Sequence, residues 1–250
     1  NQNKMSDNLL SYIGNNSWFT DYDSNKYTLI DRDISKEYQR GYIFRNLANE
    51  KVYVDPQLGR LVQNYRTGFV RLSISHYLNK DFQKAEAALL KMEEIMPSSI
   101  IPIPSKQLQY QIAQVYSGVG NQDKMKYHMK ELVERKDLLL EDYILYGKTF
   151  IQLLEDYDES KLIFETIYQN YKLIEQSILR RGFKATKISE EEWQDWQQSL
   201  PEIIYLLFLS YKNLEMYDEA KILLIDWIDK NPADDNAKEL LEEILQLESS

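Results

Sequence analysis

The chain has 250 residues, of which 43% are hydrophobic and 28% are charged, and its formal net charge is −10. It contains 0 cysteines, which excludes disulfide bridges, thiolate nucleophiles and cysteine-based zinc or iron–sulfur centres. With only 8 Gly and 6 Pro, the composition favours a mostly helical protein.

The negative charge is concentrated in the C-terminal third. Residues 187–250 contain five Lys against sixteen Asp/Glu, whereas residues 31–71 contain eight Lys/Arg against five Asp/Glu. An acidic surface argues against nucleic acid as a partner, because phosphates require a basic surface. The simpler interpretation is a solvated face that keeps the protein soluble.

No run of apolar residues approaches the roughly 18–20 that a helix needs to cross a bilayer. We therefore expect no direct membrane span. Because the chain begins at Asn1 rather than Met, we expect it to be a piece of a longer protein, so the lack of a leader here says nothing about the parent.

Residues 1–54 are expected to form a partly irregular N-terminal segment packed on the rest, with helical candidates at residues 5–13 and 35–49. Asp55 and Pro56 then predict the start of a helix. An Asp side chain caps free backbone amides, and Pro suits the first helical position.

From residue 55 to residue 250 a pattern of paired helices recurs. In such a unit of about 34 residues, a small residue early in the second helix lets two antiparallel helices approach, and a larger residue one turn later fills the space between neighbours. Alignment on the small residue gives four anchor positions, which are Ala85, Met125, Ser160 and Ala220. The copies lie near residues 65–97, 107–137, 142–168 and 200–232, and a capping helix is expected at residues 233–248.

The fourth copy is the clearest. Its key positions are Ile204, Leu207, Tyr211, Tyr217, Ala220, Leu224, Trp227 and Pro232. These spacings resemble those of tetratricopeptide repeats. The resemblance implies an all-α protein, namely a TPR-like solenoid of helix pairs (an α-α superhelix) with an irregular N-terminal segment and a C-terminal capping helix.

The anchors are 40, 35 and 60 residues apart, so the copies are unevenly spaced. A Pro-containing connector at residues 100–105 explains why the first spacing exceeds the repeat length of about 34 residues. The third spacing is long because the second helix of the third copy runs on to a basic turn at residues 180–182. Ser189 with Glu192 then predicts a capping box for the helix that follows. The third copy is degenerate, because Gly147 and Lys148 occupy positions that normally carry a large and a small residue.

The chain offers little chemistry for a catalytic or metal site. Residues 21–25 have the alternating oxygen ligands of a calcium loop, but Lys26 stands where Gly is needed and Arg32 where the final Glu belongs. The two histidines, His76 and His128, are interpreted as structural. We therefore expect no catalytic residue, no metal and no cofactor.

A partner-binding groove is predicted on the first helices of the repeats, which line the concave face in tetratricopeptide proteins. The register places there Val70, Ile74, Tyr77, Tyr110, Gln114, Thr149 and Tyr205, with Leu145, Gln152 and Leu209 beside them. Tyr brings apolar area and a hydroxyl to an interface. The alternative is that these tyrosines fill the core. A chaperone-tail receptor is not expected, because Val70 and Ile74 occupy positions where a carboxylate clamp needs Lys and Asn.

A wider resemblance covers residues 35–132. It rests on the segments Lys51–Arg66, Phe69–Leu72 and Glu93–Pro97, which resemble the soluble C-terminal region of large multi-pass membrane proteins common in Bacteroidetes. The membrane part of those proteins is similar to protein O-mannosyltransferases of the polytopic glycosyltransferase class. The resemblance implies a parent that transfers lipid-linked sugars, with this piece as its extramembranous tail. The family's catalytic acid lies in the membrane domain, so no catalytic residue carries over to this chain.

Together these observations predict a non-catalytic protein-interaction or docking module. Its partner would be a protein, a polypeptide or the membrane domain of its own parent chain, at the periplasmic or extracytoplasmic face of a bacterial membrane. The alternative is a stand-alone soluble tetratricopeptide adaptor or scaffold, with a cytoplasmic location. An enzyme is the third hypothesis.

Overall fold

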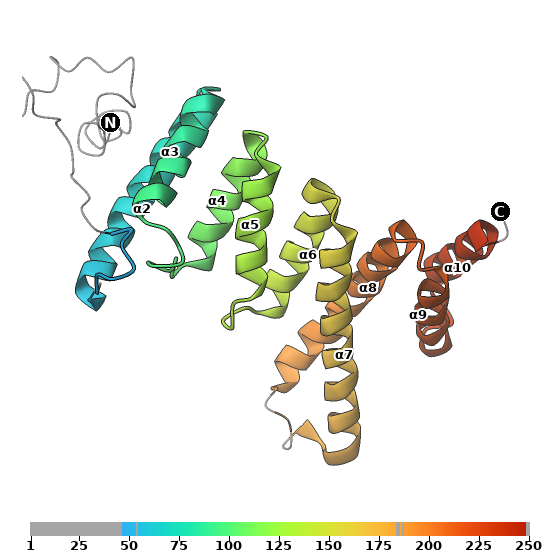
Figure 1. Cartoon of the computed structure of the whole chain (residues 1–250). Helices are drawn as coiled ribbons and strands as arrows, with labels where there is room; N and C mark the ends of the chain where they lie inside the picture. Colours follow the sequence, from blue (N-terminus) through green and yellow to red (C-terminus); the bar gives the residue numbers. More distant parts are fainter. Residues whose placement is uncertain (1–46, 54, 184–185, 187, 249–250) are drawn as a thin grey trace, which may run out of the picture. The chain divides into compact units, whose positions relative to one another are not determined.

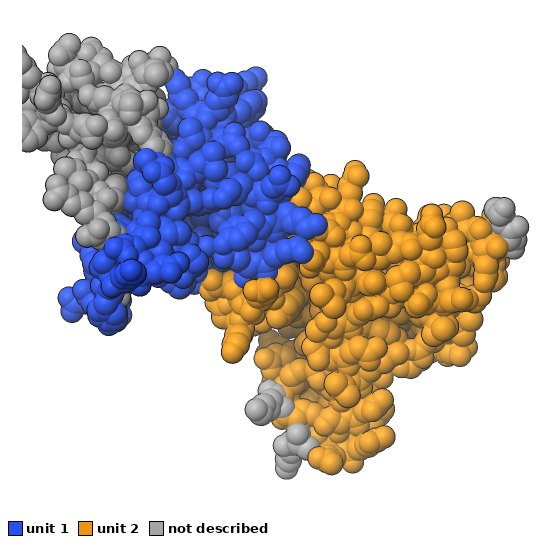
Figure 2. Space-filling model, in the orientation of Figure 1, with its two compact units in different colours: residues 1–132 blue, residues 133–250 orange. Residues whose placement is uncertain are grey.

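The computed structural model describes residues 47–53, 55–183, 186 and 188–248. Within them the chain forms nine α-helices and no β-strand (Figure 1), which confirms the prediction of an all-α protein. The chain divides into two compact units, residues 1–132 and residues 133–250 (Figure 2). The features expected at residues 5–13 and 21–32, and most of the helix expected at residues 35–49, lie outside the described residues. The described end of that predicted helix, residues 47–49, is not helical.

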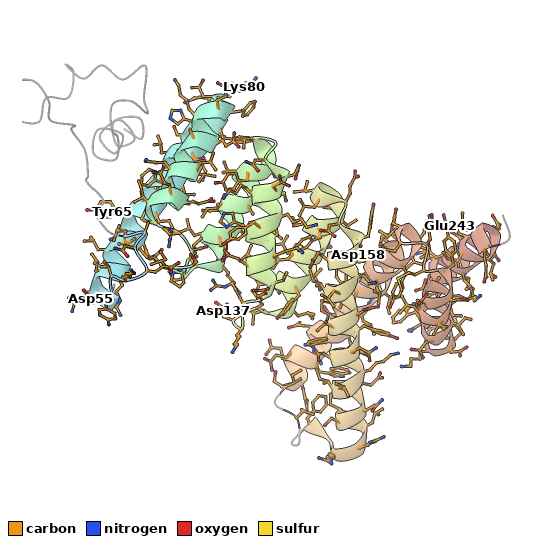
Figure 3. All side chains as sticks on the ribbon, viewed as in Figure 1. Asp55, Tyr65, Lys80, Asp137, Asp158 and Glu243 are labelled. Atoms are coloured by element: carbon orange, nitrogen blue, oxygen red, sulfur yellow. The ribbon has the colours of Figure 1, made fainter. Side chains whose placement is uncertain are left out.

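The first unit contains helices α2 (Pro56–Leu78), α3 (Phe82–Ile95), α4 (Lys106–Gly118) and α5 (Gln122–Val133), of which the last residue falls in the second unit. Helix α2 packs on α3, and both contact α4. The predicted start of α2 is confirmed, because the Asp55 carboxylate accepts hydrogen bonds from the amides of Gln57 at 2.8 Å and Leu58 at 3.0 Å. Asp55 lies at that end of the helix in Figure 3.

The second unit contains α6 (Leu140–Leu154), α7 (Tyr157–Arg181), α8 (Glu190–Asn213), α9 (Tyr217–Lys230) and α10 (Asp235–Glu248). Each helix packs on the next along the chain, and α6 also contacts α8. The predicted capping box at the start of α8 is confirmed. The Ser189 hydroxyl accepts from the Glu192 amide at 3.1 Å, and the Glu192 carboxylate accepts from the Ser189 amide at 2.8 Å.

The turns of four helix hairpins share one feature. Each has a single residue with positive φ between its two helices, and these residues are Lys80 (63°), Gly120 (85°), Glu155 (50°) and Glu215 (58°). In three of the four turns, the amide of the residue after the positive-φ residue donates to the carbonyl five residues earlier, as in a Schellman cap. These hydrogen bonds run from Asp81 to His76, from Asn121 to Tyr116 and from Met216 to Tyr211, and each is 2.9 Å long. The turn after α6 bonds Asp156 to Phe150 instead, one residue further back.

Five residues after each turn residue comes the aligned anchor of the sequence pattern. Ala85, Met125, Ser160 and Ala220 are each the fourth residue of the second helix of a hairpin, and each is 0% exposed. At one anchor the packing is polar, because the hydroxyls of Ser160 and Ser210 lie 3.1 Å apart. The four predicted anchors are therefore all buried at equivalent places.

In the third hairpin, between α6 and α7, a large side chain of α7 fills the space that a glycine of α6 leaves open. A Cβ added to Gly147 would lie 2.5 Å from Cζ of Phe164, so the Phe164 ring occupies the space of the missing side chain. Lys148 is accommodated as well, because its ammonium pairs with Glu202 of α8 at 2.6 Å. The two residues that look degenerate in the sequence thus have defined packing roles.

Arg66 holds the connector between α3 and α4. Its guanidinium is buried and donates to the carbonyls of Met96 at 2.8 Å, Ile101 at 2.7 Å and Pro102 at 3.2 Å. Because the charge lies at the C-terminal end of α3, the helix dipole stabilises it. Burial nevertheless lowers the pKa of Arg66 to about 10, against a small raising effect of Glu131.

The predicted start of the last helix is wrong by a few residues. The sequence suggested a capping helix over residues 233–248, but α10 begins at Asp235. Asp234 makes the cap: its carboxylate accepts from the Ala237 amide at 3.1 Å and from the Trp227 indole at 2.8 Å. The Asp234 carboxylate thus satisfies a free amide at the start of α10 and also joins α10 to Trp227 of α9.

Candidate functional site

The predicted groove residues of the first unit lie on two neighbouring helices. Ile74 and Tyr77 on α2 and Tyr110 on α4 are half-buried, and Gln114 on α4 is exposed. Val70 does not belong to an accessible surface, because it is only 1% exposed. It lies in the core of the first unit, where α2 packs against both α3 and α4.

Tyr77 has a packing role as well as a partly exposed face. A Cβ added to Gly118 of α4 would lie 2.5 Å from Cε2 of the Tyr77 ring, so the ring lies directly against the α4 backbone. The same ring has its centroid 5.6 Å from that of Phe82. Tyr77 therefore joins α2 to α4, and its partly exposed face stays a candidate contact surface together with Ile74, Tyr110 and Gln114.

The groove residues of the second unit lie on α6 and α8. Tyr205 on α8 is 47% exposed, and Leu145 on α6, predicted beside it, is also exposed. Thr149 is 4% exposed, and its hydroxyl donates to the Leu145 carbonyl at 2.8 Å. The groove prediction is therefore wrong for Thr149, as it is for Val70, because both side chains are buried. Periodicity identifies a face of a helix but does not show what covers that face.

A polar cluster that was not predicted lies around Glu93 in the first unit. The Glu93 carboxylate accepts from the Tyr116 hydroxyl at 2.8 Å, from Nε2 of His128 at 2.8 Å and from the Lys124 ammonium at 2.5 Å. Burial raises the pKa of Glu93, but these hydrogen bonds outweigh it, and the pKa falls below its usual value. Burial and the nearby Glu93 together raise the pKa of Tyr116 well above its usual value.

A second carboxylate, Glu131, completes the cluster. It accepts from the side chains of Gln109 at 3.0 Å, Ser98 at 3.0 Å and Tyr127 at 2.7 Å. His128 is buried between the two acids, with Nδ1 4.0 Å from Glu131. The cluster ties α3, α4 and α5 together, which is a structural use of His128, as the sequence suggested.

Other chemistry is sparse in the described part of the chain. His76 is largely buried, and burial followed by the charge of Lys84 lowers its pKa despite Asp81 at 3.8 Å. Among the described residues no group of three or more His, Asp or Glu side chains is arranged to hold a metal ion. No described helix is both long and apolar enough to cross a membrane.

The sequence did not reveal the cluster because the hydrogen-bond partners of Glu93 lie 23 to 35 residues away from it along the chain. Their only local signal is the occurrence of a polar residue at an inward helical position, and that signal does not identify the partner.

Comparison with known protein families found no match, and neither curated proteins nor solved structures gave one. The function must therefore be inferred from the residues and the fold of this chain.

Proposed function

We propose that this chain is a tetratricopeptide-like helical-repeat module that binds a protein segment. One observation carries the proposal: four hairpins have a left-handed turn residue followed, five positions later, by a fully buried anchor. Repeated helix pairs of this kind stack into solenoids that present the first helices of the pairs as an extended binding face.

The accessible side chains of the first helices suit a polypeptide partner. On α4, the half-buried Tyr110 and the exposed Gln114 offer an aromatic ring and an amide, and in the second unit the exposed Tyr205 and Leu145 offer a hydroxyl and apolar area. Aromatic side chains with a polar tip are favoured where an interface must bury area and keep its hydrogen bonds. An extended peptide or a helix fits such a face better than a small substrate does.

A non-catalytic role is supported by the use of the titratable side chains. In the first unit Glu93, Glu131 and His128 are engaged with one another and with neighbouring side chains. A general acid or base needs access to its substrate, whereas the imidazole of His128 is buried in this cluster.

The resemblance of residues 35–132 to the tail of glycosyltransferase-like membrane proteins supports, in this proposal, a location of the module on the extracytoplasmic side of a bacterial membrane. Its partner is then a protein, a polypeptide or the membrane domain of the parent chain. A stand-alone adaptor is the alternative, and recovery of the parent gene distinguishes the two. Upstream apolar segments support the tail, and a short soluble reading frame contradicts it.

Binding is tested by capture from the membranes and the soluble fraction of the source organism. The wild-type chain is compared with Tyr110→Ala/Gln114→Ala and with Tyr205→Ala. Leu90→Ala is the matched control, because Leu90 is exposed on the second helix α3. We expect at least one partner that the control retains and the first-helix variants lose. Equal recovery by all four proteins would place binding elsewhere, and turnover of a sugar substrate by the purified chain would refute the non-catalytic role.

A further inference from the structure

Helix α7 exposes one long face with an unusual composition. The residues along it are Asp158, Leu162, Thr166, Gln169, Leu173, Gln176 and Arg180, and all seven are exposed. Their separations of three or four residues place them on one side of the helix. Leu162 and Leu173 are 60% and 64% exposed, and between the two ends of the face no residue carries a charge.

The charged residues beside this face are already paired within the chain. Glu165 accepts from the Tyr211 hydroxyl at 2.8 Å, Lys172 lies 3.0 Å from Asp226, and Glu175 lies 3.4 Å from Lys230. The middle of α7 therefore presents leucines and neutral amides to solvent. In a chain with 28% charged residues, depletion of charge on an exposed face is a feature of interface cores.

The two ends of the face carry opposite charges. Asp158, marked in Figure 3, and Arg180 each lie eleven residues from Gln169. Each suits its own end of the helix dipole. Asp158 also has Lys161 of its own helix at 3.9 Å, yet its side chain remains 78% exposed.

This pattern is complementary to itself when a second copy lies antiparallel. With the two-fold axis at Gln169, Asp158 of one copy stands opposite Arg180 of the other at both ends. Leu162 of one copy comes within three residues, or about 4.5 Å along the axis, of Leu173 of the other. The two Gln169 amides meet at the centre, where they can hydrogen-bond to each other.

We propose that a second copy of this chain docks antiparallel along α7, in an isologous contact centred on Gln169. The contact is a strip about 33 Å long and about 10 Å wide. It therefore covers about 330 Å² per partner, less than the roughly 800 Å² per partner of a standard interface. The dimer is therefore weak and depends on concentration. The face belongs to a second helix of the repeats, so this contact is separate from the first-helix surface of the proposed function.

The absence of natural cysteine makes the position of the axis testable. Gln169→Cys introduces a single thiol at the axis, and Ile222→Cys introduces one on α9, where Ile222 is 67% exposed. Under mild oxidation we expect Gln169→Cys to form a disulfide-linked dimer at least ten times faster than Ile222→Cys. Equal rates for the two variants would overturn the proposal.

The orientation is tested by reversing the charges at the two ends. Asp158→Arg or Arg180→Glu alone places like charges together, so sedimentation velocity should show at least a fivefold weaker dimer. The double variant restores both pairs and should recover wild-type association, with circular dichroism confirming that α7 remains helical in each case. A double variant as weak as the single ones excludes the antiparallel pairing. A wild-type chain that stays monomeric at all concentrations excludes the dimer itself.

Discussion

Substitution of Gly147 by Ala is the sharpest test of how the third hairpin packs. The new methyl carbon would lie 2.5 Å from one atom of the Phe164 ring and 2.6 Å from another, against an optimal separation of about 3.5–4.0 Å. Phe164 is fully buried, so the ring has no free space into which to retreat. Such overpacking costs about 1–3 kcal/mol.

Gly59 provides the matched control. It also lies inside a helix, but a Cβ added there meets no atom within 4 Å. Replacement of a helical Gly by Ala raises the unfolding free energy by up to about 1 kcal/mol, and this stabilisation applies to both positions. The difference in unfolding free energy between Gly147→Ala and Gly59→Ala therefore measures the clash alone, and we expect it to be about 1–3 kcal/mol.

The assay is urea unfolding of each variant, supported by calorimetry, where about 1 kcal/mol corresponds to roughly 4 °C in Tm for a unit of this size. Phe164→Leu in the Gly147→Ala background removes the clashing atoms, so the double variant should be more stable than the sum of the single effects by at least about 1 kcal/mol. If Gly147→Ala is as stable as Gly59→Ala, the ring moves aside without cost and the packing argument fails.

Three further predictions concern other parts of the chain. Arg66→Ala should lower the unfolding free energy by at least about 3 kcal/mol, because three connector carbonyls lose a charged donor. Arg66→Lys should recover only part of that loss. Both are measured by urea unfolding, with Arg60→Ala, at an exposed position, as the control. The folded pKa of Glu93 lies below its unfolded value near 4.5, so its contribution to stability is present above that pH and is lost as the pH falls through the folded pKa. Glu93→Gln should therefore be less stable at pH 7 and lose less stability than wild type between pH 5 and pH 3, and equal losses would contradict this. Ser189→Ala should cost about 1 kcal/mol of unfolding free energy by removing a helix cap, and Ser189→Asp should restore it; an unchanged midpoint would mean that the cap contributes nothing.

Local signals in the sequence were sufficient to identify the starts of α2 and α8 and the four buried anchors of the hairpins. Asp55 and Ser189 begin helices because their oxygens reach amides two or three residues away. The four anchors are buried because a small or flexible residue at that place is required wherever two helices approach closely. These interactions involve neighbours in the chain or a repeated pattern, and both can be read from residue order.

The tertiary structure decided everything that depends on a distant partner. Gly147 is acceptable only because Phe164 of the next helix fills its place, and the two residues are seventeen positions apart. Val70 and Thr149 share the periodicity of a groove face, yet both are buried. The Glu93 cluster unites residues from α3, α4 and α5, and its hydrogen bonds exist only after the helices have packed. Periodicity states which side of a helix is apolar, whereas burial and pairing are set by what that side meets, because packing and hydrogen bonding act between atoms that only the fold brings within reach.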